Sequence, residues 1–448
     1  MDAKVQSLEI KWRGEEEYEQ ALAGAVWNGR KPSRKPAGIV LARSAAEVAA
    51  AVQLASERNL QVSVRAGGHS FSAAGVREGR LLIDVSRLNG IEINEETNIA
   101  IAGPGIYGQA VMNMVASKGL FFPAGHCPTV AIGGFLLGGG IGWNFRDCGV
   151  SCASVAAVEV VLANGEIILA DDKNYSDVYW AARGAGPGFF GVVTAFHLKL
   201  RPAPRLIRGS FAKYPIEMLS EVINWLSAIR HEVPINLEQA LYVMEHDAGK
   251  GHSLFLGSFA FGATEEQAEA SIRIVNEAPL SKRANWFVGE ARLTVEHLTS
   301  MPNHTYPQGL RYATDNILTN ASGADIVPAL EAIVKDFPTP RSHFDWINLV
   351  GMSDRAPDMA YSAVAETNIE LYSVWENPND DATLTGWAGK AARSLEPWAV
   401  GSQMSGENML GRTKPADFFT PEALKRLERL RGHYDPDRRF AGFLLKPE

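Results

Sequence analysis

Cysteine is scarce in this chain: Cys127, Cys148 and Cys152 are the only three among 448 residues. They lie close together, so no disulfide framework can join distant segments, and a cytoplasmic location is the default expectation. Cys148-x-x-x-Cys152 lacks the second ligand pair of a structural zinc site. His126 and Cys127 are adjacent, which is poor geometry for two ligands of one metal. We therefore expect no metal site.

Other absences exclude whole classes of function. The net charge is −8 and no block of Lys and Arg stands out, which disfavours a nucleic-acid partner. No apolar run reaches the roughly 18 residues of a membrane span, and the charged first residues predict no signal peptide. The G-x-x-x-x-G-K-S/T phosphate loop does not occur, which disfavours a kinase or an ATPase.

Glycine, in contrast, is concentrated in a few loops. One is Arg65-Ala-Gly-Gly-His69-Ser70, in which two glycines let backbone N–H groups converge on an anion while Arg and Ser add donors. Residues 133–142 hold six glycines in ten positions, and residues 183–194 form another glycine-rich loop that leads into a strand. Such loops lose much backbone entropy on folding. Together they indicate one extended, phosphate-bearing cofactor.

One further glycine motif favours a different interpretation. Gly103-Pro-Gly105-Ile-Tyr-Gly108 fits the G-x-G-x-x-G dinucleotide fingerprint. That fingerprint requires an acidic residue about 20 positions further on to bind the ribose. Cys127-Pro128-Thr129 stand there instead. We therefore interpret residues 103–108 as a tight strand-to-helix turn.

Secondary-structure patterns predict an α+β fold. The first ~200 residues alternate strands with helices, including a helix over 44–59 that begins with the capping box of Ser44 and Glu47. Asn164-Gly165 predicts a hairpin. After residue 205 the pattern changes to strands at 237–246, 253–261, 344–350 and 369–375. Helices are expected between them at 217–230, 265–276, 326–336 and 384–395. This suggests a second α+β domain with one sheet face free. A last helix is expected over 421–433.

Five motifs in series resemble those of the berberine-bridge-enzyme-like group, in the vanillyl-alcohol-oxidase (PCMH-type) flavoprotein superfamily. They are the 65–70 loop, Pro123-Ala-Gly-His-Cys127-Pro-Thr-Val, the 133–142 glycine run, Trp180-Ala-Ala-Arg-Gly-Ala-Gly186 with Phe190-Gly-Val-Val-Thr194, and Tyr434-Asp-Pro-Asp437 with Phe440. The resemblance implies a two-part FAD-binding domain at 1–205 (PCMH-type over about 33–204). It also implies a substrate-binding domain at 206–409, whose antiparallel sheet covers the flavin, and a segment at 410–448 that completes the FAD domain.

The same resemblance implies how FAD is held. His69 stands where the family's histidine bonds the flavin 8α-methyl carbon, and Cys127 stands where, in a bicovalent subset, a cysteine bonds flavin C6. The alternatives are a His69 that only makes hydrogen bonds within a turn, and a Cys127 that is a small buried apolar residue. The other expected FAD contacts are Arg65, Ala66, Gly67, Gly68, Ser70, Thr129, Val130, Gly133, Gly134, Gly138, Gly139, Gly142, Trp143, Gly191, Val192 and Val193.

Catalysis by hydride removal also needs a base near the flavin. Alternation along residues 369–375 puts Glu370 and Tyr372 on one strand face, which makes them candidates. In the enzyme that gives the family its name, a catalytic glutamate lies five residues before a tryptophan, as Glu370 does before Trp375. The alternative is a solvent-facing glutamate on an edge strand. Glu238, Tyr242 and His246 share another strand face, and we favour ordinary surface positions for them.

Two departures from the family pattern affect the mechanism. Many members carry a Tyr-x-Asn element whose tyrosine is the base, but residues 400–408 contain no tyrosine. Arg438 and Arg439 stand where members often have an asparagine near the flavin.

The sequence thus predicts an FAD-dependent oxidase. It would take a hydride from an alcohol, an amine or an activated ring carbon and pass the electrons to O₂, giving H₂O₂. A dehydrogenase with another acceptor and a flavin-bearing binding protein without turnover are the alternatives. Aromatic residues of the middle domain hint at a ring-bearing substrate, although core packing explains them equally well: Trp346, Tyr361, Tyr372 and Trp387.

Overall fold

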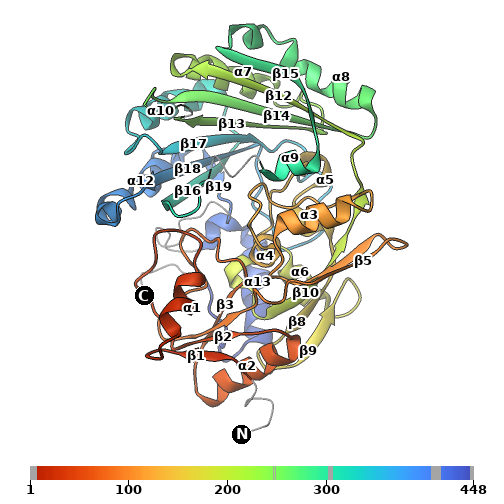
Figure 1. Ribbon diagram of the computed structural model, residues 1–448, viewed down its shortest axis with the longest axis vertical. Helices are drawn as coiled ribbons and strands as arrows, with labels where there is room; N and C mark the ends of the chain where they lie inside the picture. The colour runs from red at the N-terminus through yellow and green to blue at the C-terminus, as the bar shows by residue number, and fades with distance from the viewer. Residues whose placement is uncertain (1–7, 246, 248, 301–305, 405–414, 444–448) are drawn as a thin grey trace.

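The computed structural model describes residues 8–245, 247, 249–300, 306–404 and 415–443. Three sheets organise this part of the chain (Figure 1). The first has the strand order β1-β2-β4-β3, with the last three strands parallel and β1 antiparallel at the edge. Its strands are β1 (Ile10–Trp12), β2 (Gly38–Leu41), β3 (Val62–Arg65) and β4 (Leu81–Asp84).

Helix α2 (Ala45–Glu57) confirms Ser44 as the N-cap, whereas the Glu47 carboxylate of the predicted capping box accepts from Arg43 N–H and not from Ser44 N–H. The Ser44 side chain accepts a hydrogen bond from the Glu47 N–H at 3.2 Å, which satisfies one of the amides left unpaired at a helix start. The helix buries Val48, Val52 and Ala55 against the first sheet. The short helix α1 (Tyr18–Gly24) lies before β2.

The second sheet is antiparallel throughout, with the order β5-β6-β10-β8-β9. Its strands are β5 (Ile91–Asn94), β6 (Ile99–Ala102), β8 (Val155–Val161), β9 (Ile167–Ala170) and β10 (Val192–Lys199). The hairpin predicted at Asn164-Gly165 joins β8 to β9. A small two-stranded sheet pairs β7 (Leu120–Phe121) with β11 (Arg201–Pro202). The helices of this part are α3 (Gly108–Ala116), α4 (Ile132–Leu137), α5 (Phe145–Cys148) and α6 (Ser176–Ala182).

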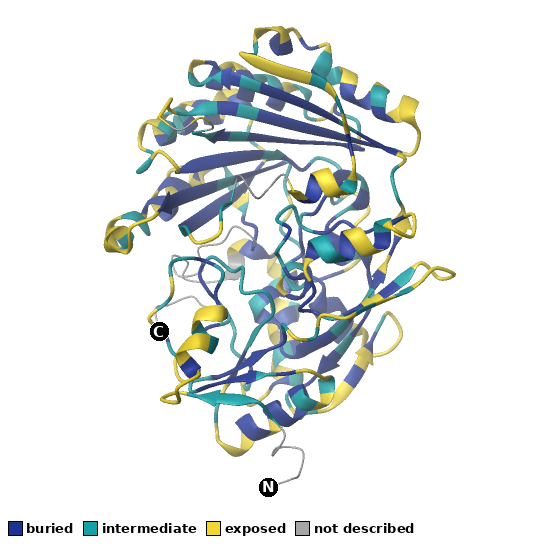
Figure 2. Cartoon of the chain, viewed as in Figure 1, coloured by how far each residue is buried: buried dark blue, intermediate teal, exposed yellow. Residues whose placement is uncertain are grey.

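The third sheet has eight antiparallel strands in the order β15-β12-β14-β13-β17-β18-β16-β19. These are β12 (Leu206–Pro215), β13 (Leu237–Met244), β14 (Ser253–Gly262), β15 (Trp286–Leu293), β16 (Arg311–Thr319), β17 (His343–Asn348), β18 (Thr367–Trp375) and β19 (Ala399–Gly401). Most of these strands are buried, as the dark blue ribbons of Figure 2 show.

Helices cover one face of this sheet. They are α7 (Leu219–Ile229), α8 (Glu265–Asn276), α10 (Gly323–Lys335) and α12 (Trp387–Ser394), and their apolar sides share a core with Leu241, Phe344 and Ile369 of the strands. A further helix, α9 (Val295–Ser300), packs against α3. The face away from the four covering helices looks toward the glycine loops (Figure 1). The predicted α+β class and antiparallel covering sheet are therefore confirmed.

The C-terminal segment returns to the first sheet. Helix α13 (Pro421–Tyr434) packs against α6, and residues 439–441 then run beside β3, where Val62 N–H donates to Arg439 O and Ala441 N–H donates to Val62 O, both at 2.7 Å. The Arg439 side chain donates to the carbonyls of Ala55 and Leu60 at the end of α2. This arginine therefore fixes that helix end. The domain boundaries at 205 and 409 stay a prediction.

Within the described ranges, none of the helices has the length and apolar character needed to cross a membrane. Nor does the described part of the chain bring three or more His, Cys, Asp or Glu side chains together in a way that suits a metal ion. Cys127, Cys148 and Cys152 are free thiols.

Candidate active site

A cavity of about 420 Å³ separates the glycine loops from the uncovered face of the eight-stranded sheet. One wall comes from residues 62–76, 125–145 and 186–193, with 440–442 beside them. The other comes from β13, β17 and β18 together with Tyr306. Fifteen of the sequence-predicted site residues line it: Arg65, Ala66, Gly67, Gly68, His69, Ser70, Cys127, Val130, Gly133, Gly134, Gly138, Gly191, Val193, Glu370 and Tyr372.

The loop at 65–70 is held tightly from behind. Arg65 donates two hydrogen bonds from Nη1 to the Asp84 carboxylate, at 2.9 and 2.8 Å, and others to the carbonyls of Gly24 and Ala25. Arg65 therefore orients the loop through these partners, a different task from the anion donor expected of it. Gly68 has φ +73°, and a Cβ there would lie 2.4 Å from Ala25 O, so no other residue fits this turn.

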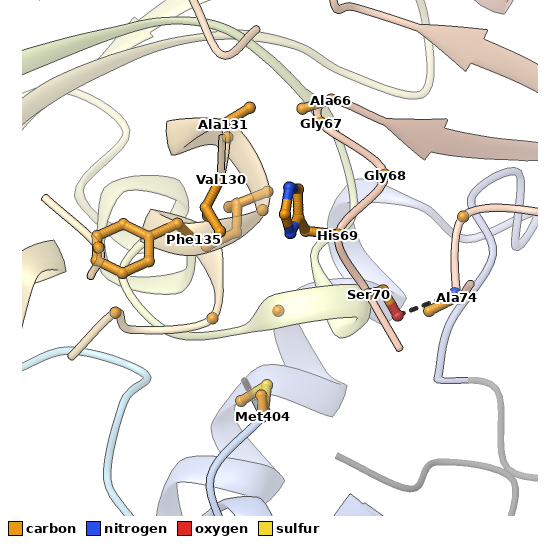
Figure 3. A pocket seen from close by; sticks show the side chains of 18 of the residues that line it. Ala66, Gly67, Gly68, His69, Ser70, Ala74, Val130, Ala131, Phe135 and Met404 are labelled. Atoms are coloured by element: carbon orange, nitrogen blue, oxygen red, sulfur yellow. Dashed lines mark hydrogen bonds between the residues drawn. The ribbon is translucent and has the colours of Figure 1, made fainter. Parts of the chain in front are cut away.

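His69 projects from this loop toward Val130 and Phe135 (Figure 3). Its Nε2 lies 3.0 Å from Thr129 Oγ1, and its ring stacks on Trp27 with a centroid separation of 4.6 Å. Burial, helped by the positive charge of Arg65, lowers the pKa of His69 to about 4. The imidazole is therefore neutral at physiological pH, and a neutral ring nitrogen keeps its nucleophilic lone pair.

Cys127 contacts the same threonine. Its Sγ lies 3.7 Å from Thr129 Oγ1, so one hydroxyl contacts both His69 and Cys127. Burial raises the pKa of the Cys127 thiol, which keeps it protonated at neutral pH. The two side chains predicted to hold the flavin are thus neighbours, but only the imidazole is already in its reactive form.

The glycine run at 133–142 serves two purposes. Gly134 lines the cavity, and a Cβ there would meet no atom within 4 Å, so this position leaves space for a ligand. Gly139 lies against the Tyr361 ring, and a Cβ at Gly142 would lie 2.1 Å from Pro123 O. These two glycines permit close packing behind the wall.

Five predicted contacts therefore lie behind the lining rather than in it: Thr129, Gly139, Gly142, Trp143 and Val192. Thr129 positions His69 and Cys127, as described above. Trp143 is buried against His126, with ring centroids 4.5 Å apart, and Val192 packs into the core around the first sheet. In the 103–108 turn, a Cβ at Gly103 or Gly105 would strike backbone oxygens, in agreement with a tight turn.

The opposite wall carries a row of polar side chains across three strands. Tyr242 of β13 pairs with Asp345 of β17, and Asp345 pairs with Glu370 of β18. All three line the cavity, as does Tyr372, two residues beyond Glu370 on the same face. Tyr242 and Glu238 are therefore part of the site, so our preference for surface positions was wrong. His246 lies outside the described residues.

Hydrogen bonds tie this row together. Glu370 accepts from the Asn368 amide at 2.8 Å through Oε1 and from the Tyr372 hydroxyl through Oε2. Tyr306 O–H donates to Asp345 Oδ2 at 2.5 Å. Burial raises the pKa of Glu370 and raises that of Asp345 well above its ordinary value. It also raises the pKa values of Tyr242, Tyr306 and Tyr372, so these phenols keep their protons.

A third carboxyl group, that of Glu238, connects the two walls. Glu238 of β13 is buried and contacts His126 Nε2 at 2.6 Å through Oε1. Its Oε2 accepts from the Asn144 N–H at 2.8 Å. Glu238 therefore anchors the sheet to the loop that carries Cys127.

Of the two alternatives for the four aromatic residues of the middle domain, core packing holds for three. Trp346 and Trp387 pack in the core between the sheet and its helices, and Tyr361 packs in another core cluster, so only Tyr372 of the four reaches the cavity. The other Phe, Tyr and Trp residues of the lining are Trp27, Phe71, Phe135, Phe145, Phe189, Tyr242, Tyr306 and Phe440. Trp27, Tyr242 and Tyr306 lie in no motif, and Phe71 directly follows the 65–70 loop.

The segment at 400–408 lacks a tyrosine, and the structure describes it as far as Met404. Met404 lines the cavity, and the Gln403 amide donates to the Tyr361 hydroxyl. Residues 405–408 lie outside the described residues.

Comparisons with known proteins agree with this geometry. Residues 36–171 match the FAD binding domain family. The chain is 31% identical over 446 residues to the FAD-linked oxidoreductase nodO of Hypoxylon pulicicidum, with 98% of each chain covered. Its fold is similar to that of 6-hydroxy-D-nicotine oxidase from Arthrobacter nicotinovorans (TM-score 0.85, 21% identity, 99% and 98% covered). It is also similar to that of BBE-like 1 from Physcomitrella patens (TM-score 0.84, 20% identity, 99% of each covered).

Proposed function

Because the chain belongs to the berberine-bridge-enzyme-like FAD-linked oxidoreductases, with FAD as cofactor, we propose that it is an oxidase of small organic molecules. The substrate loses a hydride from a carbon that bears a hydroxyl or amine group, or from an activated ring carbon, and O₂ takes up the two electrons to give H₂O₂. The observation that carries this proposal is the placement of Glu370, a carboxyl on the sheet wall that faces the FAD loops across one cavity.

FAD supplies the hydride acceptor, and Glu370 is the proposed base. Its carboxylate takes the proton from the substrate O–H or N–H as the neighbouring C–H bond breaks. The Asn368 amide and the Tyr372 hydroxyl each donate to one oxygen of Glu370 and so fix the orientation of the carboxylate. This arrangement supports a glutamate base in a chain whose sequence lacks the family's Tyr-x-Asn tyrosine.

FAD is also proposed to be bicovalent, bonded through His69 and Cys127. In support, both side chains line the cavity and contact one hydroxyl, that of Thr129. Protein denatured in acid is expected to keep its yellow colour and to be heavier than the sequence by one FAD. His69→Ala and Cys127→Ala are each expected to keep one bond, and the double variant none. Release of all the flavin from the wild-type protein would contradict this part of the proposal.

We also propose that the substrate contains an aromatic ring, because aromatic side chains line the cavity. Trp27, Phe71, Tyr242 and Tyr306 surround the same cavity as Glu370. A flat ring can stack on such side chains or meet them edge-to-face, and each pair stabilises binding by about 0.5–1.5 kcal/mol. The fold neighbour named as a nicotine oxidase acts on a molecule of this kind.

The test is a panel of aromatic alcohols, aromatic amines and sugars, each mixed anaerobically with the holoenzyme. Bleaching of the flavin identifies a substrate, and admission of O₂ should then give steady turnover and one H₂O₂ per substrate oxidised. Reduction without reoxidation by O₂ would instead indicate a dehydrogenase that uses another acceptor. Failure of every compound to bleach the flavin would favour a binding protein.

A further inference from the structure

Asp345 is a buried carboxyl to which the proposed function assigns no task. Its side chain is 1% exposed and lines the cavity. Tyr306 donates to Oδ2, whereas Oδ1 has no hydrogen-bond partner among the residues that the structure describes. A buried charged oxygen without a donor is far more costly than a neutral one, so burial favours the protonated form of Asp345.

Asp345 also lies directly across from Glu370. The two residues are register partners in the antiparallel pair β17 and β18. Directly opposite residues have Cβ atoms about 4.5–5.5 Å apart. Two ionised carboxylates this close repel each other strongly in a buried site, so one of them retains a proton, as in other carboxyl pairs.

We propose that Asp345 and Glu370 form a carboxyl pair that holds one proton, with the proton on Asp345 and the negative charge on Glu370. Asp345 is then a positioning residue that keeps Glu370 ionised as the single base of the site. This inference rests on the proposed function for the role of Glu370.

The hydrogen bonds explain why the charge lies on Glu370. Glu370 accepts from two donors, Asn368 and Tyr372, whereas Asp345 accepts from one. Donors to a carboxylate stabilise its charged form. The negative charge therefore rests on the side chain with more donors, and the proton on Asp345.

The other titratable groups around the pair do not reverse this assignment. Those nearest are Tyr242 and Glu238 of β13, His343 of β17, Tyr372 of β18, Tyr306 before β16, and His126 opposite. The three tyrosines have raised pKa values and stay neutral. The influence of His126 lowers the pKa of Glu370, which again favours charge on the glutamate.

Infrared spectroscopy of the holoenzyme tests the pair without a known substrate. Protonated carboxyls absorb at a frequency separate from carboxylates, so a difference spectrum against Asp345→Asn isolates the contribution of Asp345. We expect the wild type at neutral pH to show one protonated-carboxyl band that Asp345→Asn removes. Glu370→Gln should keep the band. As the pH is raised, the band should disappear at a lower pH than in the wild type, because Asp345 no longer has a negatively charged neighbour.

Asp358→Asn is the matched control, because Asp358 pairs with Arg426 and has a lowered pKa, and its replacement should leave the band unchanged. Flavin content and thermal melting check that each variant folds. Absence of the band from the wild type would overturn the pair and leave Glu370 as base untouched. A band that Glu370→Gln removes and Asp345→Asn does not would overturn both assignments.

Discussion

The two walls of the cavity are built in different ways. The cofactor wall consists of loops whose residues are neighbours in sequence, such as 65–70 and 125–142, and glycines let their backbones approach closely. The substrate wall is assembled from β13, β17 and β18, which meet only through strand register. Strand β13 ends at Met244, whereas β17 begins at His343 and β18 at Thr367. Local motifs therefore encode the first wall, while the tertiary fold creates the second.

The strongest test of the substrate wall is Glu370→Gln. The amide keeps the size of the side chain but cannot accept the substrate proton, so the rate of anaerobic flavin reduction by a panel substrate should fall by about 10²–10⁴-fold. Stopped-flow absorbance of the flavin measures this rate.

Glu376→Gln is the control, because Glu376 lies just beyond β18, is exposed and pairs with exposed Arg341. It should leave the rate unchanged. A Glu370→Gln enzyme that reduces its flavin as fast as the wild type would remove Glu370 from catalysis.

The strongest test of the cofactor wall is Gly134→Leu. The new side chain would enter the space that no atom of the described chain fills, so the dissociation constant for FAD should rise by about tenfold, or about 1.4 kcal/mol, and bound FAD per protein should fall. The ratio of flavin to protein absorbance measures it. Gly432→Leu, at an exposed position in α13, should keep full FAD content. Equal FAD in both variants would mean that Gly134 does not border the cofactor.

The same contrast explains what the sequence could predict. The motifs located His69, Cys127 and the loops around them, and alternation along β18 placed Glu370 and Tyr372 together on the face toward the cavity. Strands β12, β15 and β16 were not expected; Gly209 and Lys213, for example, interrupt the apolar pattern of β12.

The register partner of Glu370 on the neighbouring strand, Asp345, was missed. Asp345 carried one signal, an aspartate between Phe344 and Trp346 in a strongly apolar strand. Its pairing with Glu370 depends on strand register, which no local pattern encodes.

Within the cofactor wall, the rates at which the two flavin bonds form should depend differently on pH. The pKa of Cys127 is raised by burial, so its thiolate fraction grows about tenfold per pH unit below that pKa, and formation of the cysteinyl bond should accelerate as pH rises. His69, whose pKa is lowered to about 4, is already neutral, so formation of the histidyl bond should change little above about pH 6. Mass spectrometry of peptides from flavin-free protein incubated with FAD at several pH values measures both. If the rates of formation of the two bonds changed with pH in the same way, this difference between Cys127 and His69 would be contradicted.

The smallest expected effect concerns Trp27, which lies outside the 36–171 FAD-binding match yet lines the cavity. Its backbone N–H donates to Gly68 O at 3.0 Å, a bond that any residue here keeps, and its ring stacks on His69, so the side chain itself holds the imidazole. Loss of one such ring contact is worth about 0.5–1.5 kcal/mol, so Trp27→Leu should slow formation of the histidyl bond about two- to tenfold.

Trp12→Leu is the matched control for Trp27→Leu, because Trp12 lies in β1 and does not line the cavity. It should leave the rate of histidyl-bond formation unchanged. If Trp27→Leu and Trp12→Leu behave alike, the contact with Trp27 is only packing. If only Trp27→Leu slows formation of the histidyl bond, the cofactor wall includes a residue that no local motif encodes and that tertiary folding brings there. The two walls then differ only in how much of each is encoded by local motifs.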